Sequence, residues 1–395
     1  MGSQRNEVRV MKVRATLPMY PHILPNLGDF ICTHHDFIGI NELMTLPVSL
    51  YFLSTDLQLA YLVRVKGDAD VYNTKKYPFV HYGQKRDAVY AYVVPLARFY
   101  RYVDTLDVID RRVVWIHHSF RCGSTIWAQI FHDLPGWTVI SENLFHPHTM
   151  IGELPVDEAF EFSKSGEFRQ MALAGFKFNV SRAPADHNVV VKGAYHEGYL
   201  FDTVAPTFKN MTILHVYRNV LPSGKSMYNA FIHFDNIEMM FERAGNQFFW
   251  SEYYMRNIAG AYTMSWPDTV AAIRQTPPTD IFEWFVAVWC SLNSIALKNI
   301  HKYDIKCIKF EHFQSDKKSS IDKVFRYLDI DQSLAASALQ SVERDSQANT
   351  YISHKERAKS KMWQRIEESV KRCNRILQTL GFPDIDSDFT MPNTL

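Results

Sequence analysis

Short apolar runs alternate with amphipathic helical segments from position 111 onward, and this alternation constrains the fold more than any other feature of the sequence. The runs Val113–His117 and Met211–Tyr217 are each followed by a turn and then by apolar residues at helical spacing. Ile305–Phe310 alternates like a strand, and Ile321–Leu328 has the pattern of a helix. Strands separated by helices favour a parallel sheet, since parallel neighbours need a crossover connection. The sequence therefore predicts an α/β fold with a parallel central sheet flanked by helices.

The N-terminal part of the chain has a different pattern. Residues 1–110 are rich in aromatic and β-branched residues, in short runs such as Ala88–Val94 that proline and glycine interrupt. We interpret this region as an N-terminal extension of mixed structure that contains β-strands, and none of its motifs indicates a role. The predicted organisation is this extension, an α/β domain over 111–383 and a C-terminal tail over 384–395.

The composition excludes several classes of protein. The chain has 43 lysines and arginines against 42 aspartates and glutamates, so no overall charge attracts nucleic acid. Hydrophobic residues make up 47% of the chain, which indicates a substantial core. The five cysteines lack any CxxC spacing, which argues against a disulfide scaffold or a cysteine-based zinc site and fits a reducing compartment. The pairs His34 and His35, and His117 and His118, lack a third ligand at metal spacing, so we expect no metal site.

The sequence carries no clear membrane or secretory signal. Its first residues are polar, without the apolar stretch of a signal peptide. Leu43–Val63 is the most lipid-like stretch, but Pro47 and Asp56 interrupt it, so we interpret it as core segments of a soluble domain. We expect a cytoplasmic protein with no membrane span. If Leu43–Val63 were a signal anchor, the Golgi lumen would be the alternative.

The turn after the first predicted strand has the chemistry of an anion site. Arg121 supplies a fixed positive charge, and Gly123 would let the backbone approach a phosphate. Ser124 and Thr125 supply hydroxyl donors at the start of a helix, where free N–H groups also favour anions. An ordinary capped helix with an incidental arginine is the alternative interpretation of this segment.

The turn after the second strand contains a partial nucleotide motif. Leu221–Ser226 looks like the end of a Walker A loop, but Asn219 stands where that loop needs its first glycine. A P-loop kinase or NTPase is therefore a minor alternative. Arg218 leaves the strand and Ser226 lies one turn into the next helix, so the two can hold a single phosphate from two sides.

Together, these turns resemble those of the PAPS-dependent sulfotransferases, whose donor, 3′-phosphoadenosine-5′-phosphosulfate (PAPS), carries two separated phosphate sites. The segment 121–125 is similar to the family's 5′-phosphosulfate loop, and Arg218, Asn219 and Ser226 match its 3′-phosphate motif. Lys192 and Glu311 end strands at the expected places, and the resemblance spans roughly 111–382. It implies a P-loop-like sulfotransferase fold. The residues that it assigns to donor binding are Arg121, Cys122, Gly123, Ser124, Thr125, Arg218 and Ser226.

The sequence departs from the family pattern at several positions. Cys122 replaces the usual serine, and Val220 and Pro222 replace the proline and aspartate of the 3′-phosphate motif. The family's C-terminal Arg-Lys-Gly loop is missing. The basic stretch His354–Lys361 lies in about the same place and either does the same work or is a solvated helix face. These changes bear on donor affinity more than on the fold.

The resemblance also implies a set of catalytic residues. Arg121 would stabilise the leaving 5′-phosphate, and as an arginine it would act only through its charge. Position 194, where many members have the histidine base, is Ala194, so His196 is the candidate base and Glu197 the alternative. Lys192 would contact the sulfuryl group or pair with a carboxylate.

The sequence leads to one preferred function and two alternatives. The preferred function is the transfer of a sulfuryl group from PAPS to a hydroxyl or amine of a small-molecule or glycan acceptor. A non-catalytic relative that keeps the fold is the first alternative, and a P-loop kinase or NTPase is the second. The aromatic stretch Phe248–Trp266 either lines an apolar acceptor site or is an ordinary core helix.

Overall fold

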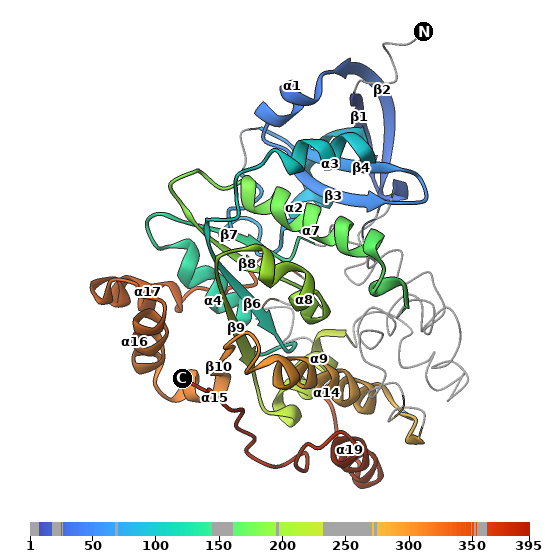
Figure 1. The fold of residues 1–395 in the computed structure, drawn as a ribbon. Coiled ribbons are helices and arrows are strands. Elements are labelled where there is room, and N and C mark those ends of the chain that lie inside the picture. Colours follow the sequence, from blue (N-terminus) through green and yellow to red (C-terminus); the bar gives the residue numbers. More distant parts are fainter. Residues whose placement is uncertain are drawn as a thin grey trace.

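Two five-stranded sheets form the framework of the protein (Figure 1). The computed structural model describes residues 8–17, 25, 27–67, 70–143, 161–194, 197–231, 271, 275–348, 350, 353 and 362–395. One sheet is antiparallel and comes from the N-terminal part, and the other is parallel and comes from the rest. The α/β class with a parallel sheet, predicted from the sequence, is confirmed.

The parallel sheet has the strand order β10-β9-β6-β8-β7. The chain runs from β6 to the edge strand β7, returns to β8 and then crosses β6 to reach β9. All carboxyl ends therefore lie at one edge of the sheet, and the connections diverge around β6, where ligands bind in folds of this type. The strands are β6 (Arg112–His118), β7 (Trp137–Ser141), β8 (Asn188–Lys192), β9 (Asn210–Tyr217) and β10 (Lys306–Lys309).

Successive side chains of the central strands point to opposite faces of the sheet and belong to two different hydrophobic cores. In β6, Val113 and Trp115 belong to the core on one face, while Val114 and Ile116 belong to the core on the other. Both faces are covered, which is why β6 reads as a continuous apolar run. The α-helices in this part of the described structure are α4 (Ser124–His132), α7 (Gly166–Ser181), α8 (Phe201–Val204), α9 (Val220–Phe231), α14 (Ile281–Asn299), α15 (Phe310–Ser315), α16 (Lys317–Tyr327), α17 (Ala335–Ser341) and α19 (Glu367–Thr379).

Helix α14 is largely apolar and buried. Within the described part of the chain it alone is long and apolar enough to cross a membrane, but 89% of its most apolar window is buried inside the protein. It packs against α9 and α19, and Glu283 on its first turn pairs with Arg372 of α19 at 2.7 Å. The helix therefore has the environment of a core helix.

The antiparallel sheet has the order β2-β1-β5-β4-β3 and sits beside α7 (Figure 1). Leu50, Leu62 and Phe99 share a core with Met171 and Phe178 of α7, so the two sheets are joined through this helix. Its elements are β1 (Val8–Thr16), β2 (Phe30–Ile38), α1 (Ile40–Thr45), β3 (Ser49–Ser54), β4 (Leu59–Val65), α2 (Val80–Asp87), β5 (Ala88–Pro95) and α3 (Leu96–Asp104).

The strands and helices predicted around the two turns are present, and two details differ from the prediction. The strand predicted over Ile305–Phe310 is shorter, since Phe310 already begins α15. The edge strand β7 was not predicted, because Trp137–Ser141 is short and follows a helix end without a distinctive pattern. The lipid-like stretch Leu43–Val63 comprises the end of α1 and two antiparallel strands, as expected for core segments.

Candidate anion-binding site

The two turns singled out in the sequence lie side by side. Strands β6 and β9 are neighbours in parallel register, with His118 opposite Val216, so the segments that leave their carboxyl ends begin at the same edge of the sheet. Each segment leads into the N-terminus of a helix, α4 or α9, where backbone N–H groups lack helical partners. The topology therefore brings together two helix N-termini of the kind that attract anions.

The turn after β6 is sharply bent. Arg121 and Gly123 both have left-handed backbones, with φ of 53° and 85°, and α4 begins directly afterwards. The intervening Cys122 is fully buried, and its thiol donates to the carbonyl of Ser119 at 2.7 Å. Burial raises the pKa of this thiol to about 11. The side chain of Cys122 therefore points into the core, and only its backbone is placed to face a ligand.

Two hydrogen bonds join the turns to each other. The Nε–H of Arg121 donates to Oγ of Ser226 at 3.1 Å, and the hydroxyl of Ser223 donates to the carbonyl of Phe120 at 2.7 Å. Arg121 also donates to Oε1 of Gln347 at 3.2 Å, across 226 positions of sequence. The guanidinium of the first turn is thus oriented by a hydroxyl of the second turn and by an amide from the C-terminal part of the chain.

Arg218, at the end of β9, lies over an aromatic ring. Its guanidinium carbon is 4.7 Å from the centroid of the Phe310 ring, and its Nε lies 3.8 Å from a carboxylate oxygen of Glu311. The indole N–H of Trp289 donates to the Arg218 carbonyl at 2.8 Å. The same Phe310 ring is packed against Gly123. One ring therefore separates the first turn from the arginine of the second.

Gly123 has no room for a side chain. A Cβ at this position would lie 2.5 Å from Cδ2 of Phe310, in a backbone conformation with φ of 85°. We expect Gly123→Ala to lower the free energy of unfolding by about 3 kcal/mol, from backbone strain together with the clash. Denaturant unfolding followed by circular dichroism measures this loss.

Gly136 is the matched control for this substitution. It also has a positive φ, 72°, but nothing lies within 4 Å of its Cβ position. Gly136→Ala should cost only the backbone term, about 1 kcal/mol. Equal losses in the two variants would contradict the close packing of Phe310 on the first turn.

Lys192, the third predicted catalytic residue, is paired with a carboxylate. It is fully buried at the end of β8, and its ammonium contacts Glu142, which follows β7. Burial alone would raise the pKa of Glu142, but the charge and hydrogen bond of Lys192, together with His118 and His81, outweigh it, and the pKa lies below its ordinary value. His118 lies 3.9 Å from the same carboxylate, and the carbonyl of Glu142 accepts from Nδ1 of His81 at 2.9 Å. Of the two roles expected for Lys192, pairing is the one that this geometry displays.

Several predicted residues lie outside the described part of the chain. These are the candidate base His196, the aromatic stretch Phe248–Trp266 and the basic stretch His354–Lys361. The alternative base, Glu197, is described and begins a short 3-10 helix after β8. It is buried, with its carboxylate next to Gly193, where a Cβ would lie 2.1 Å from Oε2.

Sequence reasoning missed several residues that shape the site. Ser223 stands in the predicted turn, and the sequence signal for it was its place at a helix N-terminus. Phe310 was predicted as part of a strand, and neither Phe310 nor Trp289 was predicted as a contact of Arg218. Gln347 and Glu142 had no signal, because each reaches its partner only through the tertiary fold.

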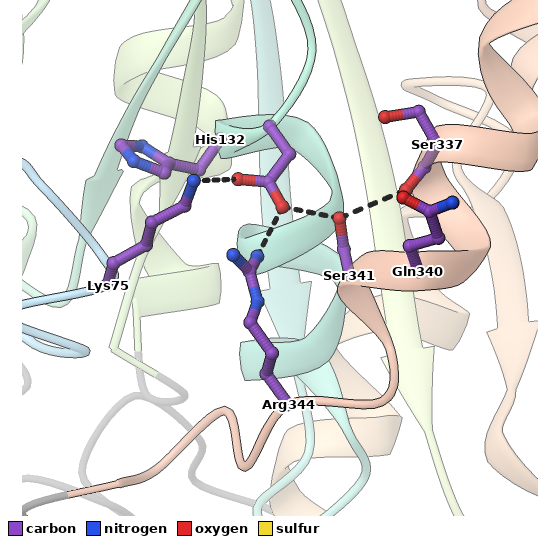
Figure 2. A pocket seen from close by; sticks show the side chains of 7 residues that line it. Lys75, His132, Ser337, Gln340, Ser341 and Arg344 are labelled. Carbon is purple, nitrogen blue, oxygen red and sulfur yellow. Dashed lines mark hydrogen bonds and ion pairs between the residues drawn. The ribbon is translucent and has the colours of Figure 1, made fainter.

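The pocket in Figure 2 lies at the far end of α4 from these turns. It has a volume of about 480 Å³, and at its centre Asp133 pairs with Lys75 at 3.0 Å and with Arg344, while Ser341 donates to the same carboxylate. These contacts tie the N-terminal extension and the end of α17 to α4. Since Lys75 and Arg344 both pair with Asp133, we assign the pocket a structural role.

The known proteins that resemble this chain in structure include several sulfotransferases, although no protein-family model and no curated protein matches its sequence. A mouse sulfotransferase, SULT7A1, complexed with PAP is 13% identical, with 62% of this chain and 69% of that one covered and a TM-score of 0.34. Sulfotransferase STF1 from Mycobacterium tuberculosis is 10% identical, with 70% and 80% covered and a TM-score of 0.41. Retinol dehydratase in complex with androsterone and inactive cofactor PAP is 13% identical, with 88% and 99% covered and a TM-score of 0.38. The case for a function depends on the residues of the two turns.

Proposed function

We propose that the chain is a sulfotransferase that moves a sulfuryl group from PAPS to a hydroxyl or amine acceptor by in-line displacement. The observation that carries the proposal is the 3.1 Å hydrogen bond from Arg121 to Ser226, because it holds two cation-bearing turns side by side. A donor with phosphate groups at both ends of one adenosine needs two such anion sites close together. An ordinary capped helix after β6 would need neither Arg218 nor the hydrogen bond from Arg121 to Ser226.

The residues of the two turns fit the charges of this donor. Arg121, the hydroxyls of Ser124 and Thr125 and the N-terminus of α4 would hold the 5′-phosphosulfate end. Arg218, Ser226 and the N-terminus of α9 would hold the 3′-phosphate. The buried thiol of Cys122 donates to Ser119, so its replacement of the family's serine leaves the backbone N–H groups as the contacts from position 122.

The reaction would need positioning and charge stabilisation more than covalent chemistry. A bond forms between the acceptor atom and sulfur while the bond from sulfur to the 5′-phosphate oxygen breaks, and adenosine 3′,5′-bisphosphate leaves with the electron pair. Arg121 would stabilise the charge that develops on this leaving group without giving up a proton. The acceptor proton goes to a base, for which His196 is the candidate and Glu197 the alternative.

A comparison of ligands tests the donor site without knowledge of the acceptor. Adenosine 3′,5′-bisphosphate at about 100 times its dissociation constant should raise the stability by about 2.7 kcal/mol, which thermal unfolding detects as a shift of a few degrees. ATP, with or without magnesium, should give no comparable shift. Stabilisation by magnesium-ATP alone would instead support the P-loop kinase or NTPase.

One observation favours a second candidate, a non-catalytic sulfotransferase-like binding protein. Lys192 is fully buried against Glu142, so its ammonium is committed to an ion pair in this conformation. Turnover of labelled PAPS with phenols, alcohols and glycans would support the enzyme. Binding of the bisphosphate without turnover of PAPS on any acceptor class would support the binding protein.

We also propose a cytoplasmic location and a small-molecule or glycan acceptor. All five cysteines lie in the described part of the chain, and they are free thiols there rather than disulfides. Four of them are buried, and only Cys32 is partly accessible. A reducing compartment suits such a set of thiols.

A further inference from the structure

The C-terminal segment lies against the end of strand β9. The N–H of Cys307 on β10 donates to the carbonyl of Asn393, and the N–H of Leu395 donates back to Cys307, both at 3.0 Å. Nearby, the N–H of Met391 donates to the hydroxyl of Tyr217, the last residue of β9, at 2.9 Å. The segment therefore runs along the sheet edge and reaches the start of the second turn.

Asn219 connects this segment to the second turn. Its amide Nδ2–H donates to Asp388 at 2.8 Å, and its Oδ1 accepts from the N–H of Phe389 at 3.2 Å. A side-chain amide can donate and accept at once, whereas an aspartate or a leucine at this position could not make both bonds. The residue that breaks the Walker A pattern thus holds the C-terminal segment.

A buried cation anchors the other side of Asp388. Lys309, at the end of β10, is completely buried and pairs with Asp388, whose own side chain is 76% exposed. Lys309 also donates to the hydroxyl of Thr390 at 3.1 Å. A buried ammonium without partners is costly, so the ion pair fixes Asp388, and through it the segment, in place.

The same segment supports Arg218 by a second route. The ring of Phe389 packs edge-on against Trp289, with centroids 5.8 Å apart, and the Trp289 indole donates to the Arg218 carbonyl. The N–H of Asn219 donates to Glu311 at 3.2 Å. The peptide group between 218 and 219 is therefore held at its carbonyl by Trp289, which packs against Phe389, and at its N–H by Glu311.

We infer that residues 388–394 are a positioning element that aims Arg218 at the 3′-phosphate of the donor. This inference rests on the proposed function, because it assumes that Arg218 binds that phosphate. Asp388 accepts a hydrogen bond from Asn219, and Phe389 packs against Trp289. They act through Asn219 and Trp289, so their loss should reduce recognition of the 3′-phosphate and leave contacts to the rest of the nucleotide unchanged.

Two ligands and two variants test this role. Affinity is measured by calorimetry for adenosine 3′,5′-bisphosphate and for adenosine 5′-phosphate, which lacks the 3′-phosphate. Asn219→Ala keeps the pair between Lys309 and Asp388 and should therefore fold. It should weaken bisphosphate binding about tenfold, as expected for one or two lost hydrogen bonds, and leave adenosine 5′-phosphate binding unchanged. Asp388→Ala also removes the carboxylate that pairs with Lys309, and it should weaken bisphosphate binding selectively as well. The double variant should lose less than the sum of the two single losses, because the contact between Asn219 and Asp388 is common to both.

Asp386→Ala is the matched control. Asp386 lies two residues away and pairs with Arg365 on the surface, so its loss should change neither affinity. An Asn219→Ala variant that keeps the full preference for the bisphosphate, or that loses both ligands by the same factor, would overturn the inference. Failure of the unmodified protein to bind the bisphosphate would instead reject the proposed function, and this inference with it.

Discussion

Arg218→Ala is expected to weaken binding of adenosine 3′,5′-bisphosphate about 100-fold or more, which would abolish retention on the immobilised ligand. Arg218 directly follows β9 beside the N-terminus of α9, and the first turn, with Arg121, lies across the Phe310 ring. The loss should be large because a charge-assisted bond to phosphate is replaced by a methyl group, and the desolvated phosphate would lose its main cation.

The variant should keep its fold. The side chain of Arg218 is partly exposed. Its backbone is held by the bond from Trp289 to its carbonyl and by the contacts of Asn219, and the substitution leaves both in place. Arg326→Ala, at an exposed position on α16, is the control for the loss of one arginine elsewhere. Unchanged binding by Arg218→Ala, with normal unfolding, would remove the second turn from the donor site.

The sequence was informative about the two turns because each is a local pattern. A strand, a bend with small residues and a helix start are consecutive in the chain, so Gly123, Ser124 and Arg218 could be assigned before the fold was known. That the turns are neighbours depended on the resemblance to a known family, since strand order is not a local property. The structure gives the physical link in the contact between Arg121 and Ser226.

Tertiary partners could not be predicted in the same way. Glu142 follows a short edge strand, and nothing near it in the sequence indicates that Lys192 is its partner. Asn219 was interpreted only as the residue that replaces a glycine of the Walker A loop. In the structure its side-chain amide binds Asp388 and Phe389, which are distant in the sequence. Such contacts form only when the sheet brings strand ends together, so the chemistry of a side chain alone does not reveal them.

Buried histidines lead to the second large effect, a loss of stability in mild acid. Burial lowers the pKa of His81 and of His215 to about 4, and burial with the nearby Lys192 charge lowers that of His118 to about 3. Glu142 raises the pKa of His81 and of His118, and Asn293 raises that of His215, but these effects are smaller than burial. Lys85 lowers the pKa of His81 further. The net direction is downward at all three.

The sign follows from where each state takes up protons. The unfolded chain binds a proton at each histidine as the pH falls through about 6.5, whereas the folded protein does not until about pH 4 or below. The stabilisation is complete above pH 6.5 and is lost between these values, by about 1.4 kcal/mol per pH unit for each histidine. Three histidines would remove most of the stability of an ordinary domain before the carboxylates of the unfolded chain titrate.

Urea unfolding at about pH 7, 6 and 5 measures this slope. His215→Gln should reduce this slope by the share of one histidine, since one protonation site is gone; His132, whose pKa burial also lowers, contributes to the slope as well. His301→Gln, at an exposed position, should leave the slope as it is.

The same measurement reports on the protonation state of His118. Its two ring nitrogens lie 3.0 Å from the carbonyl oxygens of Ser119 and Gly193, and a neutral ring can donate to only one of them. If the slope of the unmodified protein is smaller than expected by the share of one histidine, and His118→Gln does not change it, then His118 is charged in the folded protein. A second cation would then lie beside Lys192 at the carboxyl edge of the sheet.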